Sequence, residues 1–205
     1  IEAFREGLDI HKITASKVFN VPLSEVTKEQ RGNAKAVNFG VIYGMSGFGL
    51  ADELHISRRD AERYIKDYFD KHQAVKKYMD EQVEAAKQLG FTTTVLGRRR
   101  YINEIHSPNR MTRNLGERLA MNSPIQGTAA DIIKIAMNKV YTALKKEYPE
   151  SKLILQVHDE LIFDVPEEEV ELMKELVTEG MTKAMTLDVP LTVECNIGKN
   201  WYEAK

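Results

Sequence analysis

The sequence is poor in cysteine and has no long apolar run. Cys195 is the single cysteine among 205 residues, which excludes an internal disulfide and is compatible with a reducing cytoplasm. No apolar run approaches the roughly 20 residues that span a bilayer, and residues 1–10 have no signal-peptide pattern. We therefore expect a cytoplasmic protein without a membrane segment. The chain starts at Ile1 rather than at methionine, which suggests a piece of a longer polypeptide.

The sequence also lacks internal repeats, low-complexity tracts and Gly/Ser-rich linkers. With 42% hydrophobic and 29% charged residues, it has the composition of a globular chain with one sizeable domain or two lobes. The net charge of −2 does not by itself indicate nucleic-acid binding. The distribution is uneven, because residues 95–146 have a balance of +7 and residues 147–205 one of −9. A protein that holds a polyanion and cations in different places fits this pattern, and so does a solvated basic face beside an acidic tail.

Helical periodicity dominates the chain, with two hairpins and a last strand between and after the helices. Ser57 is a candidate N-cap and Gly90 a candidate C-terminal glycine. Helices are predicted over residues 9–19, 28–44, 50–54, 58–72, 74–89, 112–146 and 167–185, with Pro124 kinking or splitting the sixth. Hairpins are predicted over residues 91–102, with a turn at Gly97, and 153–165, and a strand over residues 189–198. The predicted fold class is α+β, mainly helical with a small antiparallel sheet.

One predicted helix carries a polarised row of side chains. Arg31, Lys35, Phe39 and Tyr43 recur every four residues, so they form one stripe about 18 Å long with cations first and aromatic rings last. A polyphosphate with a planar base would match that order, because Arg and Lys bind phosphate oxygens and aromatic rings stack on bases. The alternative is an ordinary amphipathic helix with Phe39 and Tyr43 in the core.

The hairpin over residues 153–165 carries acidic residues at its tip. Asp159 and Glu160 interrupt two runs of alternating apolar residues, so these carboxylates must stay near water or pair with a cation. Magnesium prefers oxygen ligands and retains several waters, which suits an exposed carboxylate. A solvated turn is the alternative interpretation.

Three segments resemble motifs of family A DNA polymerases, the bacterial DNA polymerase I type, and they follow one another along the chain in the same order as in that family. The segment RGNAKAVNFGVIYG is similar to motif B, QVHDE is similar to motif C, and GERLAMNSPIQGTAADIIKIAM resembles the helix between them that follows the primer–template minor groove. The resemblance covers essentially the whole chain. It implies a mainly helical fingers region over residues 1–110 and part of a palm over residues 111–205.

The resemblance implies a role for each matching residue. Arg31, Lys35 and His11 would bind the triphosphate of the incoming dNTP, with Phe39 against its sugar and Tyr43 near the templating base. Asp159 would be a metal ligand and, with Lys35, catalytic, while Glu160 would support it and His158 would lie by the primer terminus. The residues implied to contact primer–template DNA are Arg118, Asn122 and Gln126. Arg98, Arg99 and Arg100 also suit template phosphate contacts, although a solvated basic cluster fits equally well.

The chain departs from the family at one essential place. Two Mg²⁺ ions serve the family's transfer of dNMP from dNTP to a primer 3′-OH, and their second aspartate belongs to motif A, an Asp-Tyr-Ser-type segment that these 205 residues do not contain. That segment and the thumb would belong to a remainder of the polypeptide upstream of Ile1. We therefore expect a DNA-directed DNA polymerase as the parent protein and little or no activity in this chain alone.

Two other functions fit parts of the sequence. A single-subunit RNA polymerase also has a Lys and a Tyr-Gly in its motif B, but that class resembles Met-Thr where this chain has Phe39 and Gly40. A nucleic-acid-binding module without catalysis would use the same basic residues and would be indifferent to the loss of Asp159.

Overall fold

The computed structural model describes residues 1–147 and 150–204 of the 205-residue chain. Lys205, the last residue of the predicted palm region, and residues 148–149 lie outside this description. The chain divides into two compact units, residues 2–126 and residues 127–205 together with Ile1.

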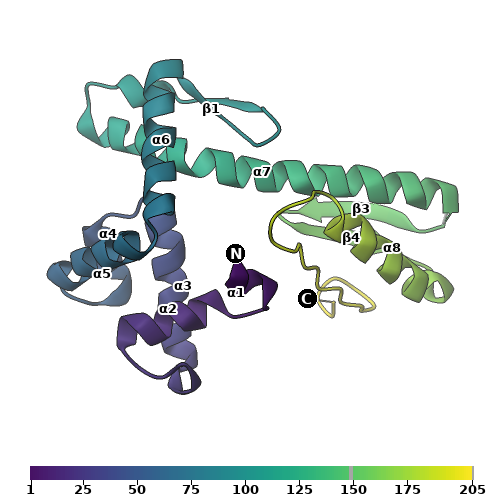
Figure 1. The fold of residues 1–205 in the computed structure, drawn as a ribbon. Helices are drawn as coiled ribbons and strands as arrows, with labels where there is room; N and C mark the ends of the chain where they lie inside the picture. The colour runs from purple at the N-terminus through teal and green to yellow at the C-terminus, as the bar shows by residue number, and fades with distance from the viewer. Residues whose placement is uncertain (148–149, 205) are drawn as a thin grey trace. The chain divides into compact units, whose positions relative to one another are not determined.

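Helices make up most of both units (Figure 1). The α-helices are α1 (Glu2–Arg5), α2 (Ile10–Phe19), α3 (Lys28–Ile42), α4 (Gly47–Leu54), α5 (Arg58–Lys71), α6 (Gln73–Leu89), α7 (Arg110–Glu147) and α8 (Val170–Thr182). Short 3-10 helices are η1 (Leu23–Glu25), η2 (Asn103–His106) and η3 (Glu167–Glu169). The strands are β1 (Phe91–Thr93), β2 (Arg99–Tyr101), β3 (Lys152–Val157) and β4 (Glu160–Asp164).

The first unit has two apolar clusters. One is formed by α3, α4 and α5 around Val37, Val41 and Leu50, which are at most 2% exposed. The other joins α6, η2 and α7 around Ile102 and Ile105, both 1% exposed. Because the apolar positions of α3 are buried in the first cluster, the opposite side of this helix is left for polar and aromatic residues.

The predicted helix ends in this unit are confirmed. The Ser57 hydroxyl accepts a hydrogen bond from the Asp60 backbone N–H at 3.1 Å, and so caps α5. Gly90 ends α6 with a φ of +76°, a conformation that favours glycine. These ends depend on residues close in the chain, which explains why the sequence predicts them.

α7 runs through Pro124 without interruption, so the predicted possibility of a split helix is wrong (Figure 1). Proline lacks the N–H that would donate to the carbonyl four residues earlier. The neighbouring Ser123 hydroxyl donates to the Leu119 carbonyl at 2.6 Å, a bond that Ser often makes inside helices. A missing N–H removes one hydrogen bond from a helix of 38 residues, and the many remaining bonds hold it together.

The second unit packs one face of a hairpin and α8 with the C-terminal part of α7. Val140, Leu144, Met173 and Val177 form the buried cluster, against which Leu153 and other hairpin residues pack. β3 and β4 are antiparallel, with Val157 opposite Glu160 and Leu153 opposite Phe163. The predicted hairpin is therefore confirmed.

The predicted strand over residues 189–198 is wrong, because these residues adopt no regular structure. A strand needs a partner edge for its backbone N–H and C=O groups. The described residues contain two separate two-stranded antiparallel sheets, β1–β2 and β3–β4, and neither pairs with residues 189–198. The α+β fold class with small antiparallel sheets is nevertheless confirmed.

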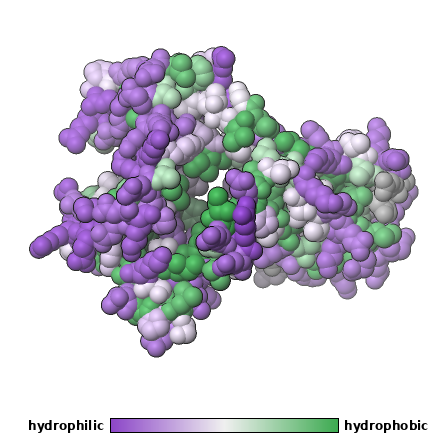
Figure 2. All heavy atoms as spheres, in the orientation of Figure 1, coloured by the Kyte–Doolittle hydropathy of each residue, from purple (hydrophilic) through white to green (hydrophobic). Residues whose placement is uncertain are grey.

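Charged residues cover α5, in a region where hydrophilic side chains gather in Figure 2. On α5, ion pairs such as Arg58–Glu62 at 2.8 Å and Lys66–Asp70 at 2.9 Å join successive turns. Within the described parts of the chain, none of the helices has the length and apolar character needed to cross a membrane.

Candidate functional site

Local sequence fixes both ends of α3. At the start, the Thr27 hydroxyl accepts from the Gln30 backbone N–H at 3.1 Å, while the Gln30 side chain accepts from the Thr27 N–H at 3.0 Å. At the end, the Met45 N–H donates to the Gly40 carbonyl and the Gly44 N–H to the Val41 carbonyl. These paired bonds are a Schellman motif with Gly44 in the left-handed conformation. The helix that carries the polarised row is thus bounded on both sides.

The row itself lies on the accessible side of α3. Arg31 and Lys35 are exposed, Phe39 is 41% exposed and Tyr43 is partly buried. The exposure of Phe39 differs from an ordinary amphipathic helix, in which this ring would lie in the core. An aromatic ring in contact with water next to two cations is available to stack on a ligand.

The members of the row contact one another through their rings and charges. The ring centroids of Phe39 and Tyr43 are 6.0 Å apart with the planes tilted by 27°, and the Lys35 Nζ lies 6.0 Å from the Phe39 centroid. His11 of α2 joins the row, since its ring centroid is 5.6 Å from that of Phe39. Four of the predicted nucleotide-binding residues therefore form a continuous surface.

Asp9 is a residue of this site that the sequence analysis missed. It caps α2 by accepting from the backbone N–H groups of His11 and Lys12, both at 3.0 Å. Its other oxygen accepts from the Arg31 Nε at 2.5 Å, and this hydrogen bond is the main cause of the lowered pKa of Asp9. An Asp directly before a helical run was the available signal.

His11 has a lowered pKa, mainly because its partial burial disfavours the charged imidazolium. The positive charges of Arg31 and Lys35 lower it further, while Asp9 acts in the opposite direction. The charged form of His11 is therefore disfavoured, and Arg31 and Lys35 are the cations of the row.

Gly40 and Gly44, which follow Phe39 and Tyr43 of the row, have a packing role that the sequence did not reveal. A Cβ on Gly40 would lie 2.9 Å from the Met45 side chain, which packs on the α3–α4–α5 cluster. A Cβ on Gly44 would lie 2.5 Å from the Met121 Cε of α7, and the φ of Gly44 is +71°. These contacts and the positive φ of Gly44 are sufficient to explain why both positions are glycine.

α7 brings a second set of predicted residues to the end of α3. The Asn122 Nδ2 donates to the Tyr43 carbonyl at 3.5 Å. Among the described residues, the buried Asn122 Oδ1 has no hydrogen-bond partner. Arg118 and Gln126, one turn away on either side, are exposed. Asn122 thus links the end of α3 to the predicted DNA-binding face of α7.

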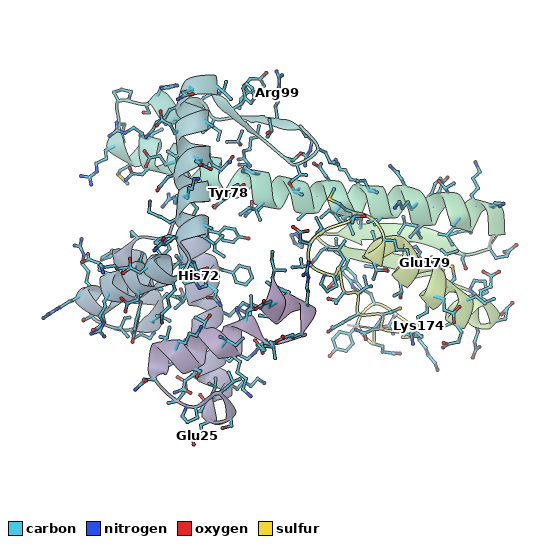
Figure 3. The ribbon with its side chains drawn as sticks, viewed as in Figure 1. Glu25, His72, Tyr78, Arg99, Lys174 and Glu179 are labelled. Carbon is cyan, nitrogen blue, oxygen red and sulfur yellow. The ribbon has the colours of Figure 1, made fainter. Side chains whose placement is uncertain are left out.

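The basic hairpin β1–β2 is a separate feature of the same unit. Arg98, Arg99 and Arg100 are all exposed, and the Arg99 guanidinium lies 4.8 Å from the centroid of the Phe91 ring (Arg99 is labelled in Figure 3). This cation–π contact holds Arg99 against the hairpin, while its charge stays accessible to an anion.

The acidic hairpin belongs to the other compact unit. His158 and Asp159 form the turn between β3 and β4, and Glu160 begins β4 opposite Val157. His158 has a φ of +53°, which few residues other than glycine adopt. Its carbonyl accepts from the Gln156 Nε2 at 2.5 Å, so a side chain holds this turn. Asp159 is exposed.

The described residues contain no complete donor set for magnesium. Mg²⁺ takes oxygen ligands in octahedral geometry, and Asp159 with the adjacent Glu160 supplies carboxylate oxygens at the turn. In residues 1–147 and 150–204, no group of three His, Cys, Asp or Glu side chains is placed to hold a metal ion. The residues present therefore fit one side of a metal site and not a closed one.

Comparison with known proteins gives the same family over the whole chain. A family model described as DNA polymerase family A matches residues 1–203. The DNA polymerase I of Caldicellulosiruptor bescii is 51% identical over 205 residues, which are 100% of this chain and 24% of that protein. The DNA polymerase I of Bacillus subtilis is also 51% identical over 205 residues, or 23% of its length.

A solved structure agrees with these relatives. The POL domain of Pol1 from M. smegmatis, in complex with DNA primer-template and dNTP, has a TM-score of 0.93 and 47% identity, and the match covers 99% of this chain and 36% of that one. The chain thus spans about a quarter of the length of the curated relatives. With the family model matching residues 1–203, the chain belongs to DNA polymerase family A.

Proposed function

We propose that this chain is the nucleotide- and template-handling part of a DNA-directed DNA polymerase that transfers dNMP from dNTP to a primer 3′-OH. The observation that carries the proposal is the exposed row on α3, in which two cations are followed by the stacked rings of Phe39 and Tyr43. Arg31, Lys35 and His11 bind the triphosphate, Phe39 contacts the sugar and Tyr43 lies near the templating base. Lys35 also neutralises charge that develops during transfer.

The DNA ligand is primer–template duplex, and the basic residues of the first unit bind it. Arg118, with the uncharged Asn122 and Gln126, hydrogen-bonds the primer–template near the active site, and Arg98, Arg99 and Arg100 bind template phosphates. The Pol1 relative from M. smegmatis was solved with DNA primer-template and dNTP, which supports these ligands. In this proposal residues 1–110 belong to the fingers and residues 111–205 to the palm.

The reaction is metal-assisted phosphoryl transfer. When bound, two Mg²⁺ ions neutralise charge on the attacking and leaving oxygens. Asp159 is the ligand in this chain, Glu160 supports it, and His158 lies beside the primer terminus. The second aspartate comes from the remainder of the polypeptide, so the 205 residues alone have little or no polymerase activity.

The cytoplasmic location stays a prediction of the sequence.

Single-nucleotide primer extension tests the proposal. In the full-length polymerase, Lys35→Ala should raise KM for dNTP and lower kcat, whereas Lys77→Ala on α6, a 77% exposed side chain paired with Glu81, should change neither. Asp159→Ala should lose nearly all of the rate and keep most of the primer–template affinity. A dNTP affinity unchanged by Lys35→Ala would contradict the assignment of the row.

Two further outcomes separate the alternatives. Membership of DNA polymerase family A decides against a single-subunit RNA polymerase, and the full-length protein should accordingly incorporate dNTP in preference to rNTP. A nucleic-acid-binding module without catalysis would give no metal-dependent extension and no effect of Asp159→Ala. Template-directed incorporation by the isolated chain at a rate near that of full-length relatives would refute its inactivity.

A further inference from the structure

A buried amide connects α2 to α3 behind the nucleotide row. Asn38 is 7% exposed, although it is flanked on α3 by Phe39 of the accessible row. Its Nδ2 lies 3.0 Å from the His11 Nδ1, and its Oδ1 lies 3.0 Å from the Thr14 Oγ1. The two helices pack side by side here, as Figure 1 shows. Both polar atoms of the Asn38 amide therefore hydrogen-bond side chains of α2.

The chemistry of the three groups gives these hydrogen bonds a direction. In this arrangement the Thr14 hydroxyl donates to the amide oxygen, and the amide nitrogen faces His11. An amide nitrogen only donates, so the His11 Nδ1 must accept and cannot carry a proton. A neutral imidazole with an unprotonated Nδ1 carries its proton on Nε2. An amide in this orientation is compatible with only the Nε2–H tautomer of neutral His11.

That tautomer suits a phosphate ligand. The charged groups around the imidazole are Asp9 at the start of α2 and Arg31 and Lys35 on α3. Burial and the two cations lower the pKa of His11, so its ring contributes a hydrogen-bond donor rather than a third positive charge. An Nε2–H group donates to a phosphate oxygen, whereas the other tautomer would present a lone pair that repels it.

We propose that Asn38, oriented by Thr14, is a positioning residue that holds His11 as the Nε2–H tautomer, so that His11 donates a hydrogen bond to the triphosphate on the Arg31–Lys35 row. This inference rests on the proposed nucleotide function. The competing explanation is a purely structural one, in which Asn38 only joins α2 to α3.

The first test reads the tautomer directly. In the full-length polymerase with ¹⁵N-labelled histidine, the two ring nitrogens of His11 should give separate signals, and the signal of Nδ1 should be that of an unprotonated nitrogen. The signals of His11 are assigned by their loss in His11→Gln. Thr14→Val should weaken this separation, because the amide loses the donor that orients it, while Thr14→Ser should restore it. An Nδ1–H tautomer in the unmodified protein would overturn the inference.

The second test uses a change of one atom. In Asn38→Asp the carboxylate accepts from Nδ1–H, so His11 carries both protons to higher pH and the ionisation seen in the pH profile of KM for dNTP should move up by about one unit or more. Thr14→Val should raise KM by about tenfold with little change in kcat, the scale expected for the loss of one charge-assisted hydrogen bond. A structural role alone predicts that Thr14→Val lowers the melting temperature and leaves KM for dNTP unchanged.

The controls distinguish failure of this inference from failure of the proposed function. If Arg31→Ala and Lys35→Ala leave KM for dNTP unchanged, the row does not bind the triphosphate and both proposals fail. If those variants raise KM while Asn38→Asp leaves the pH profile and the ¹⁵N signals unchanged, only the positioning role fails. Thr14→Val replaces a hydroxyl by a methyl of similar size, so this test remains available even if Asn38→Asp does not fold.

Discussion

Substitutions of Asp9 should separate two contributions that one carboxylate makes to stability. One oxygen caps α2 through the His11 and Lys12 N–H groups, and the other pairs with Arg31 at 2.5 Å. Asparagine is as good an N-cap as aspartate, so Asp9→Asn should keep the cap and lose only the ion pair. Asp9→Ala should lose both. The free energy of unfolding is the quantity to compare.

The structure sets the size of each contribution. The side chains of Arg31 and Asp9 are 45% and 35% exposed, so the ion pair is screened by water and should contribute about 0.2–1 kcal/mol. The cap should contribute about 1 kcal/mol. We therefore expect Asp9→Asn to cost about 0.5 kcal/mol and Asp9→Ala about 1.5 kcal/mol. Urea unfolding at pH 7 followed by circular dichroism resolves this difference.

The pH dependence provides an independent check. Arg31 lowers the pKa of Asp9 below its ordinary value of 3.8, so the ion pair contributes fully above that value and is lost as the pH falls through the lower pKa of the folded state. The gap between the unmodified chain and Asp9→Asn should shrink from pH 7 to pH 3. Glu25→Gln, an exposed acid of η1 labelled in Figure 3, is the control. Equal losses in Asp9→Asn and Asp9→Ala would refute the cap, and a gap independent of pH would refute the ion pair.

Four other substitutions test the packing and the DNA contacts. Gly32→Ala on α3 should stabilise the chain by about 0.5–1 kcal/mol, because the added Cβ would meet no described atom within 4 Å. Gly116→Ala on α7 should destabilise it by about 1–3 kcal/mol, because the added Cβ would lie 2.7 Å from the Ile105 backbone nitrogen. A urea midpoint that falls in Gly32→Ala or rises in Gly116→Ala would contradict this reasoning. Leu50→Ala should cost about 2–5 kcal/mol in the same assay, since Leu50 is 0% exposed in the α3–α4–α5 cluster. Arg99→Ala in the full-length polymerase should weaken primer–template binding and reduce the slope of log K against log salt by about 1 in fluorescence anisotropy, and an unchanged slope would count against a phosphate contact.

The sequence by itself determined the features that depend on neighbours in the chain. The four-residue repeat of Arg31 to Tyr43 placed these side chains on one face of a helix, and the cap at Ser57 and the glycine at Gly90 gave helix ends. The alternation around Asp159 gave a hairpin with an acid at its turn. A helix or hairpin closes its hydrogen bonds within a few residues, so its signal is local.

Only the tertiary structure decided which distant groups meet. Asp9 pairs with Arg31 across 22 positions, and Asn38 reaches His11 across 27, because packing of α2 on α3 brings these residues together. The alternating residues 189–198 formed no strand, since alternation does not supply a partner edge. Pairing between segments depends on the packing of the whole unit. For that reason the contacts of Asp9 with Arg31 and of Asn38 with His11 could not be predicted from the residues next to them in the sequence.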